Sequence, residues 1–414
     1  MKRISLLFLF FPTFLMAQNS LDSITINLSG FVRGDYWYET RQNYGACEEL
    51  FTLYPKPRKL DSEGNDINAE PVANMTAIAT RLRTVVTGPE ILGAKSMGYV
   101  EADFTSNLGT DGFRFRHAFF KLAWENSSVL FGRYWHPMFV TDVFPTVMAL
   151  NTGAPFQVFN RSPQLRFNQK IGKFRIVSAL VYQGDYASFG PSEEGITTSA
   201  DYMKNAGFPE FNLRLEFLSN GNVLGIGGSY KIIQPQMITQ GVNGTYKTNE
   251  TVSGSLIMSY LKVTSGKFSY KYRVMLGQNV SEHLLLGGYA VSEYDQARGE
   301  SEYTPYQHLF MWGNIVYGDQ LRVGLFGGFA KNLGTVDPVA TGLFATTYAR
   351  GADIDYSYRI APHLQYSIKN MDVGVEAEYT TAAYGNINYD NNNIVKNAEE
   401  VSNLRVLLTA VYNF

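Results

Sequence analysis

The sequence predicts an all-β protein, a transmembrane antiparallel β-barrel of about 16 strands with an inward-folded loop. Three observations predict it. Segments of alternating apolar and polar residues follow one another, and the first is far longer than the roughly 5 to 6 residues of an ordinary globular strand. The connections between these segments alternate between long and short. The last segment ends the chain on an aromatic residue, Phe414.

The composition agrees with a barrel in lipid. The 414 residues include 27 Tyr, 28 Phe and 38 Gly, a profile typical of β structure with aromatic residues at two membrane interfaces. Bulk hydropathy does not reveal such proteins, because lipid-facing and lumen-facing residues alternate and average out. The formal net charge of -2 gives no support for nucleic-acid binding. A single cysteine, Cys47, excludes an intrachain disulfide framework.

Residues 1–17 have the pattern of a signal peptide. Lys2 and Arg3 precede an apolar run of about a dozen residues, and Ala17 is a small residue at a possible cleavage site. The run is shorter than the roughly 20 apolar residues that a transmembrane helix needs. We therefore expect an exported protein. Residues 18–414 form one barrel domain in this interpretation, since no linker or shift in composition divides them.

The first strand shows the alternation most completely. Between Ile24 and Glu39, apolar residues such as Leu28 share one face, while Arg33 and Asp35 share the other. A tilted membrane-crossing strand needs about 9 to 11 residues, so this segment can cross with an overhang.

The remaining strands are expected in hairpins. Arg41–Met75 is predicted to be a polar loop, and Asn279–Pro305 a second long loop, because reading LLLGGYAV as a strand would break the alternation of long and short connections. The expected strands are Thr76–Gly88, Gly93–Phe104, Phe113–Glu125, Val129–Trp135, Pro163–Lys170, Phe174–Gln183, Phe211–Leu218, Val223–Ile233, Thr251–Thr264, Phe268–Gln278, Tyr306–Tyr317, Leu321–Lys331, Asp353–Ile368, Val373–Tyr384 and Asn403–Phe414.

The strand FRFRHAFFKLAWE is ambiguous, because apolar residues occur on both of its faces. An arginine that faces lipid near the midplane costs about 2 to 4 kcal/mol, which outweighs the modest gain of exposing aromatic rings to lipid. We therefore predict that Arg114 and Arg116 point inward. His117, Phe119 and Lys121 then point outward.

The segment from Pro137 to Pro163 is predicted to be a long loop that folds into the lumen and narrows it. It is rich in hydrophobic residues without a steady period. Loops of this length are usually functional or disordered, and one this apolar needs a packed site.

The charges on the expected inner wall predict an electropositive constriction. Over the first seven strands the basic residues exceed Asp35, Glu101 and Asp103 by about six, judged from strand parity. Such a pore selects anions, and arginine binds carboxylates through a bidentate fork. Each wall arginine can instead pair with a carboxylate and stiffen the wall, so both roles stay open. The candidate pore-lining residues are Arg33, Arg81, Arg83, Lys95, Arg114, Arg116, Arg133, Arg166 and Arg175, with Asp142 and Arg161 as the loop's acid and base.

Several segments resemble a known family. Tyr412 and Phe414 resemble the C-terminal signature of outer-membrane barrels, which implies recognition by the barrel assembly machinery. FRFRHAFFKL, LFGRYW and RSPQLRF, between Arg81 and Asn168, are similar to the DcaP-like porins. The resemblance implies a homotrimer in a Gram-negative outer membrane and a water-filled channel for small hydrophilic solutes, favouring anions such as dicarboxylates. Outward-facing small residues would suit packing of three barrels, namely Gly30, Gly34, Ala94 and Gly98. The N-terminal coiled coil of some relatives is absent from the sequence.

Other functions have little support in the sequence. The five His residues are scattered, and neither G-x-S-x-G nor H-E-x-x-H occurs, so we expect no enzyme, no cofactor and no metal site. Asp61, Glu63, Asn65 and Asp66 hint at a calcium loop, but the Gly at the sixth position and the acid at the twelfth are missing. The alternative that stays open is a non-conducting barrel whose extracellular loops bind a partner, in an adhesin-like or structural role.

Overall fold

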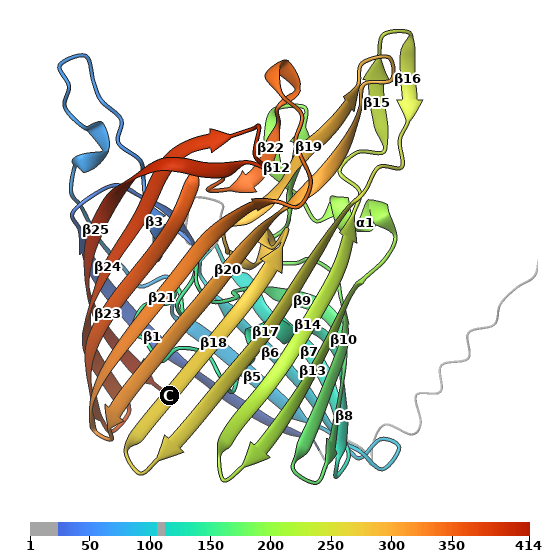
Figure 1. The fold of residues 1–414 in the computed structure, drawn as a ribbon. Coiled ribbons are helices and arrows are strands. Elements are labelled where there is room, and N and C mark those ends of the chain that lie inside the picture. Colours follow the sequence, from blue (N-terminus) through green and yellow to red (C-terminus); the bar gives the residue numbers. More distant parts are fainter. Residues whose placement is uncertain (1–23, 106–111) are drawn as a thin grey trace, which may run out of the picture.

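The computed structural model describes residues 24–105 and 112–414 as a closed antiparallel β-barrel (Figure 1). The main sheet contains 19 strands, and the first closes the ring by pairing with the last. β4 and β5 occupy one position beside β1, and β19 and β22 extend beyond the wall, so the barrel has 16 strands. The predicted fold class is therefore confirmed. The signal peptide predicted for residues 1–17 lies outside the described residues.

The barrel wall follows the predicted hairpin order, with short turns at one end and longer loops at the other (Figure 1). It consists of β1 (Thr25–Glu39), β4 (Val72–Thr76) with β5 (Arg81–Thr87), β6 (Lys95–Asp103), β7 (Arg114–Ala123), β8 (Ser127–Trp135), β9 (Arg161–Ile171), β10 (Phe174–Val181), β13 (Glu210–Ser219), β14 (Asn222–Ile233), β17 (Val252–Ser265), β18 (Phe268–Gln278), β20 (Glu300–Gly318), β21 (Leu321–Thr335), β23 (Ile354–Ile368), β24 (Met371–Asn388) and β25 (Ile394–Asn413).

Shorter elements lie in the loops. They are β2 (Asn43–Ala46), β3 (Phe51–Pro55), β11 (Phe189–Ser192), β12 (Gly195–Thr198), β15 (Ile238–Gly241), β16 (Gly244–Lys247), β19 (Gly287–Asp295), β22 (Thr347–Arg350), the helix α1 (Asp201–Ala206) and the 3₁₀ turns η2 (Ile67–Ala69), η3 (Pro137–Phe139), η4 (Ser281–His283) and η5 (Gly342–Phe344). No helix of the described residues is long and apolar enough to cross a membrane.

The two faces of each strand differ as the alternation predicts. On β1, Val32 is 51% exposed on the outer face, whereas Arg33 and Asp35 are buried inside. The same pattern places apolar side chains such as Ile257 toward lipid and polar side chains such as Arg273 toward the lumen.

β7 departs from the predicted alternation, because a β-bulge interrupts it. Glu101 of β6 lies opposite His117, and the next residue, Ala102, lies opposite Phe115, so Arg116 is an extra residue on β7. Arg116 and His117 are both buried. The prediction that His117 points outward is therefore wrong.

The bulge reverses the parity of the rest of β7. Phe119 stacks on Tyr99 inside the barrel with ring centroids 4.9 Å apart, and Lys121 shares its face. Phe120 is 51% exposed on the outer face. Phe119 and Lys121 thus point inward, contrary to the prediction, while Arg114 points inward as predicted.

Two predicted surface loops are partly wrong as well. The hairpin β2–β3, within the expected polar loop Arg41–Met75, folds into the lumen, where Leu53 is fully buried. LLLGGYAV, which was predicted to be loop, contributes Gly287 onward to strand β19, and the residues before it are buried around η4. β19 pairs with the end of β20 beyond the barrel wall, so the count of 16 barrel strands is unaffected.

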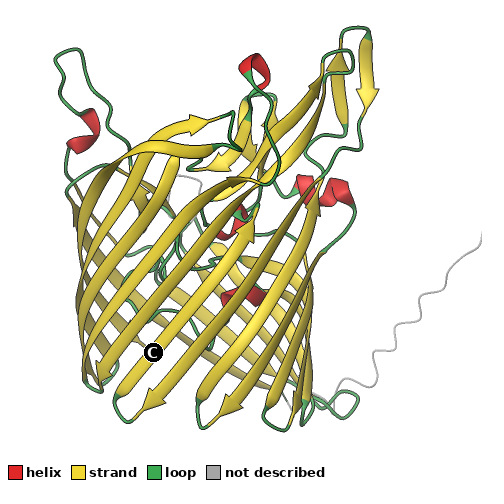
Figure 2. Ribbon diagram, in the orientation of Figure 1, coloured by secondary structure: helices red, strands yellow, loops and turns green. Residues whose placement is uncertain are grey.

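The core of the protein therefore lies inside the barrel. Figure 2 shows loop segments that fill the lumen between the strands. Three segments fold inward, namely the hairpin β2–β3, residues 136–160 and the segment around η4. We call residues 136–160 the constriction loop. Phe51 of the hairpin packs edge-on against Phe159 of the constriction loop, with ring centroids 4.7 Å apart.

Candidate functional site

The constriction loop is fastened to the wall formed by β17 to β25. Arg273 of β18 is fully buried and donates hydrogen bonds to the carbonyl oxygens of Met138 (3.0 Å), Phe139 (3.2 Å) and Val143 (2.6 Å). It also donates to Gln157 Oε1 at 2.8 Å. One guanidinium group thus organises both ends of the loop.

Further along the loop, Glu376 of β24 accepts hydrogen bonds from the backbone N–H groups of Met148 (2.8 Å) and Ala149 (3.1 Å). Arg359 of β23 donates to the Ala154 carbonyl at 2.9 Å. These bonds satisfy backbone groups that would otherwise be buried without partners. The prediction that the loop folds into the lumen is therefore supported by its contacts.

The space left open in the lumen lies against the opposite wall, along the strands nearest to the loop in sequence. A cavity of about 380 Å³, the upper cavity, lies between the loop and the arginines of β1, β5 and β7. Arg33 of β1 also contacts the loop directly, because it donates to the Met148 carbonyl at 2.7 Å. Its lining includes Arg33, Arg81 and Arg116 on the wall and Phe139 and Phe144 on the loop.

Two further cavities continue from the upper one toward the short turns. The middle cavity, of about 350 Å³, shares Tyr134 with the upper cavity and is also lined by Lys121 and Arg166. The lower cavity, of about 290 Å³, shares Lys121 with the middle one and is lined by Lys170 and Arg175. The shared residues define a continuous row of cavities along one side of the lumen.

Most of the upper arginines are paired with carboxylates. Arg33 pairs with Asp35 at 2.8 Å, and Arg116 contacts Glu101 at 2.9 Å and Asp103 at 2.7 Å. The same carboxylates also hold neighbouring guanidinium groups, those of Arg83 at 3.0 Å and Arg114 at 2.9 Å. For these arginines the structure shows the wall-stiffening role.

Arg81 differs from these neighbours. Within residues 24–105 and 112–414 its guanidinium group makes no ion pair with a carboxylate, and its Nε atom has no hydrogen-bond partner. It lies over the Phe31 ring, 5.1 Å from the centroid, and lines the upper cavity. Arg166, in the middle cavity, donates to Gln164 Oε1 at 2.8 Å and to a backbone carbonyl rather than to a carboxylate. These two guanidinium groups keep the charge with which a solute could pair.

The other candidate residues have separate positions. Lys95 is exposed near a short turn, away from the constriction loop. Asp142 of the loop pairs with Arg175 at 2.5 Å, so it joins the loop to a wall arginine. Arg161 is fully buried and pairs with Asp185.

In the structure, strand alternation places Arg133 on the outer face of β8, but its guanidinium group reaches Asp185 in the loop after β10. The cross-strand partners of Arg133 are Ala118 and Pro163, and Phe131, two residues earlier on its strand, is 56% exposed on the outer face. The buried carboxylate of Asp185 also pairs with Arg161, so the pore-lining role of Arg133 stays a prediction. Lys121, which strand alternation in the sequence placed on the outer face, also points inward.

The possible calcium loop near Asp61 is a surface turn. The backbone N–H groups of Asn65 and Glu63 donate to Asp61 at 2.8 Å each, and these hydrogen bonds lower the pKa of its carboxyl group. Asp66 pairs with Arg41 at 2.8 Å.

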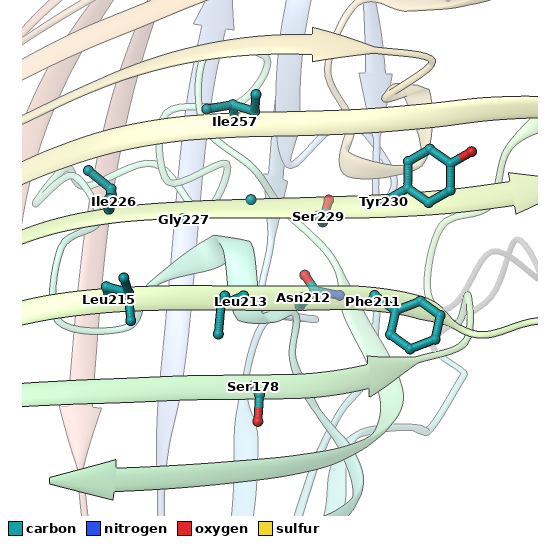
Figure 3. A pocket seen from close by; sticks show the side chains of 11 residues that line it. Ser178, Phe211, Asn212, Leu213, Leu215, Ile226, Gly227, Ser229, Tyr230 and Ile257 are labelled. Atoms are coloured by element: carbon teal, nitrogen blue, oxygen red, sulfur yellow. The ribbon is translucent and has the colours of Figure 1, made fainter.

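A separate groove of about 580 Å³ lies on the outer wall (Figure 3). Leu213, Ile226 and Ile257 are each more than 40% exposed around it, and Gly227 and Gly228 form its floor without side chains. This apolar groove faces the lipid and is separate from the row of cavities.

Comparison with known proteins shows the fold. No family model and no curated protein matches the sequence. The outer membrane channel DcaP of Acinetobacter baumannii is 20% identical, with a TM-score of 0.67 over 95% of this chain and 99% of that chain. The trimer form of OmpT of Vibrio cholerae is 10% identical, with a TM-score of 0.54 over 95% and 100%.

OmpF of Salmonella typhi in complex with daunomycin is 12% identical, with a TM-score of 0.53 over 95% of this chain and 99% of that chain. These proteins share the closed barrel across nearly the whole described chain. The chain therefore has the fold of an outer-membrane porin, as the segments that resemble the DcaP-like porins predicted.

Proposed function

We propose that the protein is an outer-membrane porin through which small hydrophilic solutes diffuse passively, with a preference for anions such as dicarboxylates. The observation that carries this proposal is the lining of the three cavities. Each is lined by at least two Arg or Lys residues, and among the described residues Glu125 is the only acid that lines any of them. A charged, narrow and partly desolvated passage selects by sign.

The burial of the carboxylates explains how the cavity lining can be positive in a chain of almost no net charge. Asp35, Glu101 and Asp103 are each no more than 2% exposed and lie behind arginine side chains. Since Lys121 also lines the cavities, the excess of basic residues estimated from parity is not reduced. The solute would therefore meet guanidinium and ammonium groups first.

Reversal potentials of the purified protein in planar bilayers, under a salt gradient, test the proposal. We expect anion selectivity, and we expect Arg81→Gln and Arg166→Gln to lower it, because each removes a guanidinium group without a carboxylate partner. Succinate in the bath should reduce the chloride current of the native protein more than that of Arg81→Gln. Arg298→Gln is the matched control, since Arg298 pairs with Glu300 beyond the barrel wall.

A reversal potential on the cation side would overturn the anion preference. A second function has one observation in its favour, because three inward segments pack much of the lumen with hydrophobic side chains. If the folded protein neither conducts ions nor swells proteoliposomes in succinate, a non-conducting barrel whose loops bind a partner is the better interpretation. The expectation that the protein is not an enzyme stays a prediction.

We also propose that the barrel assembles as a homotrimer and is inserted by the barrel assembly machinery through its last strand. One of the similar structures is described as a trimer form. The N–H groups of Gly30 and Phe414 each donate to the other residue's carbonyl oxygen, at 2.9 Å and 3.1 Å, so the last residue takes part in closing the barrel. Of the small residues expected on the outer face, Ala94 is fully buried and is not available for contact.

A further inference from the structure

A buried cluster of two imidazoles and one carboxylate lies where the constriction loop begins. His136 precedes η3, Glu210 is the first residue of β13, and His283 is the last residue of η4. One possible ligand atom of each residue lies within 4.8 Å of the others. The three residues are 2%, 2% and 1% exposed. Segments distant in sequence thus bring three metal-binding side chains together inside the barrel.

Within the described part of the chain, one polar atom of each residue in this cluster has no hydrogen bond of ordinary geometry. Among the described residues, none meets hydrogen-bond geometry with His136 Nε2, His283 Nδ1 or Glu210 Oε1. His136 Nε2 and Glu210 Oε1 lie 3.3 Å apart, and the two imidazole centroids are 4.6 Å apart. His136 Nε2 and Glu210 Oε1 can pair with each other at 3.3 Å, whereas His283 Nδ1 has no partner among the described residues. A buried polar atom without a partner costs about 1 to 3 kcal/mol, and a ligand that contacts all three residues would remove that cost.

The surrounding charges favour a cation as that ligand. Glu282 lies beside the cluster, with its Oε1 atom 3.4 Å from His283 Nε2, and its Oε2 atom pairs with Lys231 at 2.5 Å. Within the described residues, Glu210 has no ion-pair partner other than His136. The ammonium group of Lys231 thus pairs with Glu282, and Glu210 has only the imidazole of His136 among the described residues, which leaves this buried carboxylate without a permanent cation.

We propose that His136, Glu210 and His283 bind a divalent transition-metal ion, with Glu282 or a water molecule as a further ligand. Imidazole nitrogen together with carboxylate oxygen suits Zn²⁺ and its neighbours, whereas Ca²⁺ and Mg²⁺ prefer oxygen alone. Zinc bonds of about 2.0 to 2.2 Å place ligand atoms roughly 3.3 to 3.5 Å apart. His136 and Glu210 already have this spacing, and His283 must approach by up to about 1.5 Å.

Binding has a local consequence at the start of the loop. His136 Nδ1 accepts the backbone N–H of Met138 at 3.2 Å, so the lone pair of Nδ1 is in use. A metal ion on Nε2 leaves the ring proton on Nδ1, and this hydrogen bond then opens. Binding would therefore cost the hydrogen bond from Met138. In return, the ion would link the constriction loop to β13 and η4 and would hold the loop in the lumen.

Titration of the untagged full chain in detergent tests the site, with Zn²⁺ as the probe after dialysis against EDTA. We expect one tightly bound ion per chain in calorimetry and a higher Tm when Zn²⁺ is present. Glu210→Gln and His283→Gln should each weaken binding more than about tenfold, as the loss of a ligand does. His363→Gln is the control, because His363 lies on β23 outside the cluster.

Heat-modifiable migration on gels establishes that each variant contains a folded barrel. Stoichiometric binding that is unchanged in both Glu210→Gln and His283→Gln would overturn the proposal, and so would the absence of stoichiometric binding by the native chain. Co²⁺ added to the native chain gives a readout that needs no variant. Visible absorption bands of a four-coordinate nitrogen and oxygen site are expected, and their absence would contradict the assignment.

Discussion

The inner-wall arginines have three different roles, which depend on what each guanidinium group contacts. Arg116 pairs with two carboxylates of the neighbouring strand and stiffens the wall. Arg273 holds carbonyl groups of the constriction loop. Arg81 has no carboxylate partner among the described residues and faces the upper cavity. Only the third role supplies charge to a passing solute.

Arg273→Met should destabilise the protein and loosen the constriction loop. The substitution removes the donors for three loop carbonyls and for Gln157, all of them buried. The Met138 and Val143 carbonyls lose their donor among the described residues, whereas Phe139 O keeps Gln157 as its donor and Gln157 Oε1 keeps Trp312. Two buried acceptors left unsatisfied, with a charged donor lost, should lower the free energy of unfolding by about 2 to 5 kcal/mol. Urea unfolding in lipid vesicles, followed by tryptophan fluorescence, measures this loss. Single-channel records should show more frequent changes between conductance levels.

Arg322→Met is the matched control for that experiment. Arg322 also points inward, but it is partly exposed and contacts Asp372 at 3.8 Å rather than the loop. We expect a change of no more than about 0.5 to 1 kcal/mol. Equal losses in the two variants would contradict the role given to Arg273.

Strand alternation predicted the direction of most of these side chains but not their roles. Arg81 of β5 and Arg116 of β7 both point inward and flank β6. Arg81 makes no ion pair among the described residues, whereas Arg116 pairs with two carboxylates. Register does not explain this difference, because Arg81 lies directly opposite Asp103, whose carboxylate pairs with the two arginines of β7 instead. The loop partners of Arg273 and Glu376 lie more than 100 residues away in the sequence. A local sequence pattern cannot predict contacts between residues so far apart.

At the scale of the element, β7 shows that strand alternation predicts side-chain direction only where the strand is regular. The extra residue at Arg116 puts two consecutive side chains inside and shifts all later ones by one position. The energy argument that placed the arginines inward holds for Arg114 and Arg116. It could not detect that Lys121, five residues further on, would point inward as well.

Cysteine labelling tests the parity after the bulge. In a Cys47→Ser background, Lys121→Cys should react with a water-soluble, membrane-impermeant thiol reagent, because residue 121 lines the middle and lower cavities. Phe120→Cys should react at least about tenfold more slowly, since its side chain faces lipid and thiolates do not form there. Mass spectrometry after timed quenching measures both rates. Faster labelling at position 120 would show that the bulge is absent.

Cys47 itself provides a control in the native chain. It is buried, and its Sγ lies 3.1 Å from the Tyr186 hydroxyl oxygen, so it should label slowly while the barrel is folded.

The inward loops were only partly predictable, because their burial depends on contacts with segments distant in sequence. The constriction loop was recognised because it is long and apolar throughout. In the first loop, the apolar residues of β3 are followed by a charged run, and the loop as a whole appears polar by composition. The residues before β19 are an apolar run too short to distinguish a strand from a buried turn. Their burial depends on contacts with the constriction loop, such as the Phe159 N–H donating to the His283 carbonyl at 2.9 Å.

At the scale of the whole molecule, the barrel is asymmetric around its axis. The constriction loop is bound to the wall of β17 to β25, and the row of cavities runs along the strands from β1 to β10. The wall of β17 to β25 holds most of the loop, while the opposite wall lines the cavities and contacts the loop through Arg33 and Arg175. Under the proposed function, a short row of inner residues would determine the selectivity of a chain whose net charge is only -2.

The proposed trimer has a matched test on the two sides of this barrel. Gly34 lies on the outer face of β1, and a Cβ atom there would meet nothing within 4 Å. Gly313 lies on the outer face of β20, across the barrel, and is equally open. Because both positions face outward, Gly34→Phe and Gly313→Phe should each fold as barrels, with the new ring in lipid.

If the face that carries β1 packs against neighbouring barrels, an inserted ring at Gly34 overpacks the contact, at a cost of about 1 to 3 kcal/mol for each of the three interfaces. Native gels and light scattering should then show monomers for Gly34→Phe and trimers for Gly313→Phe and the native chain. Trimers that resist Gly34→Phe but dissociate in Gly313→Phe would place the contact on the wall of β17 to β25. In that arrangement the cavities would lie on the outer side of the assembly, so the same two variants also locate the channels relative to the threefold axis.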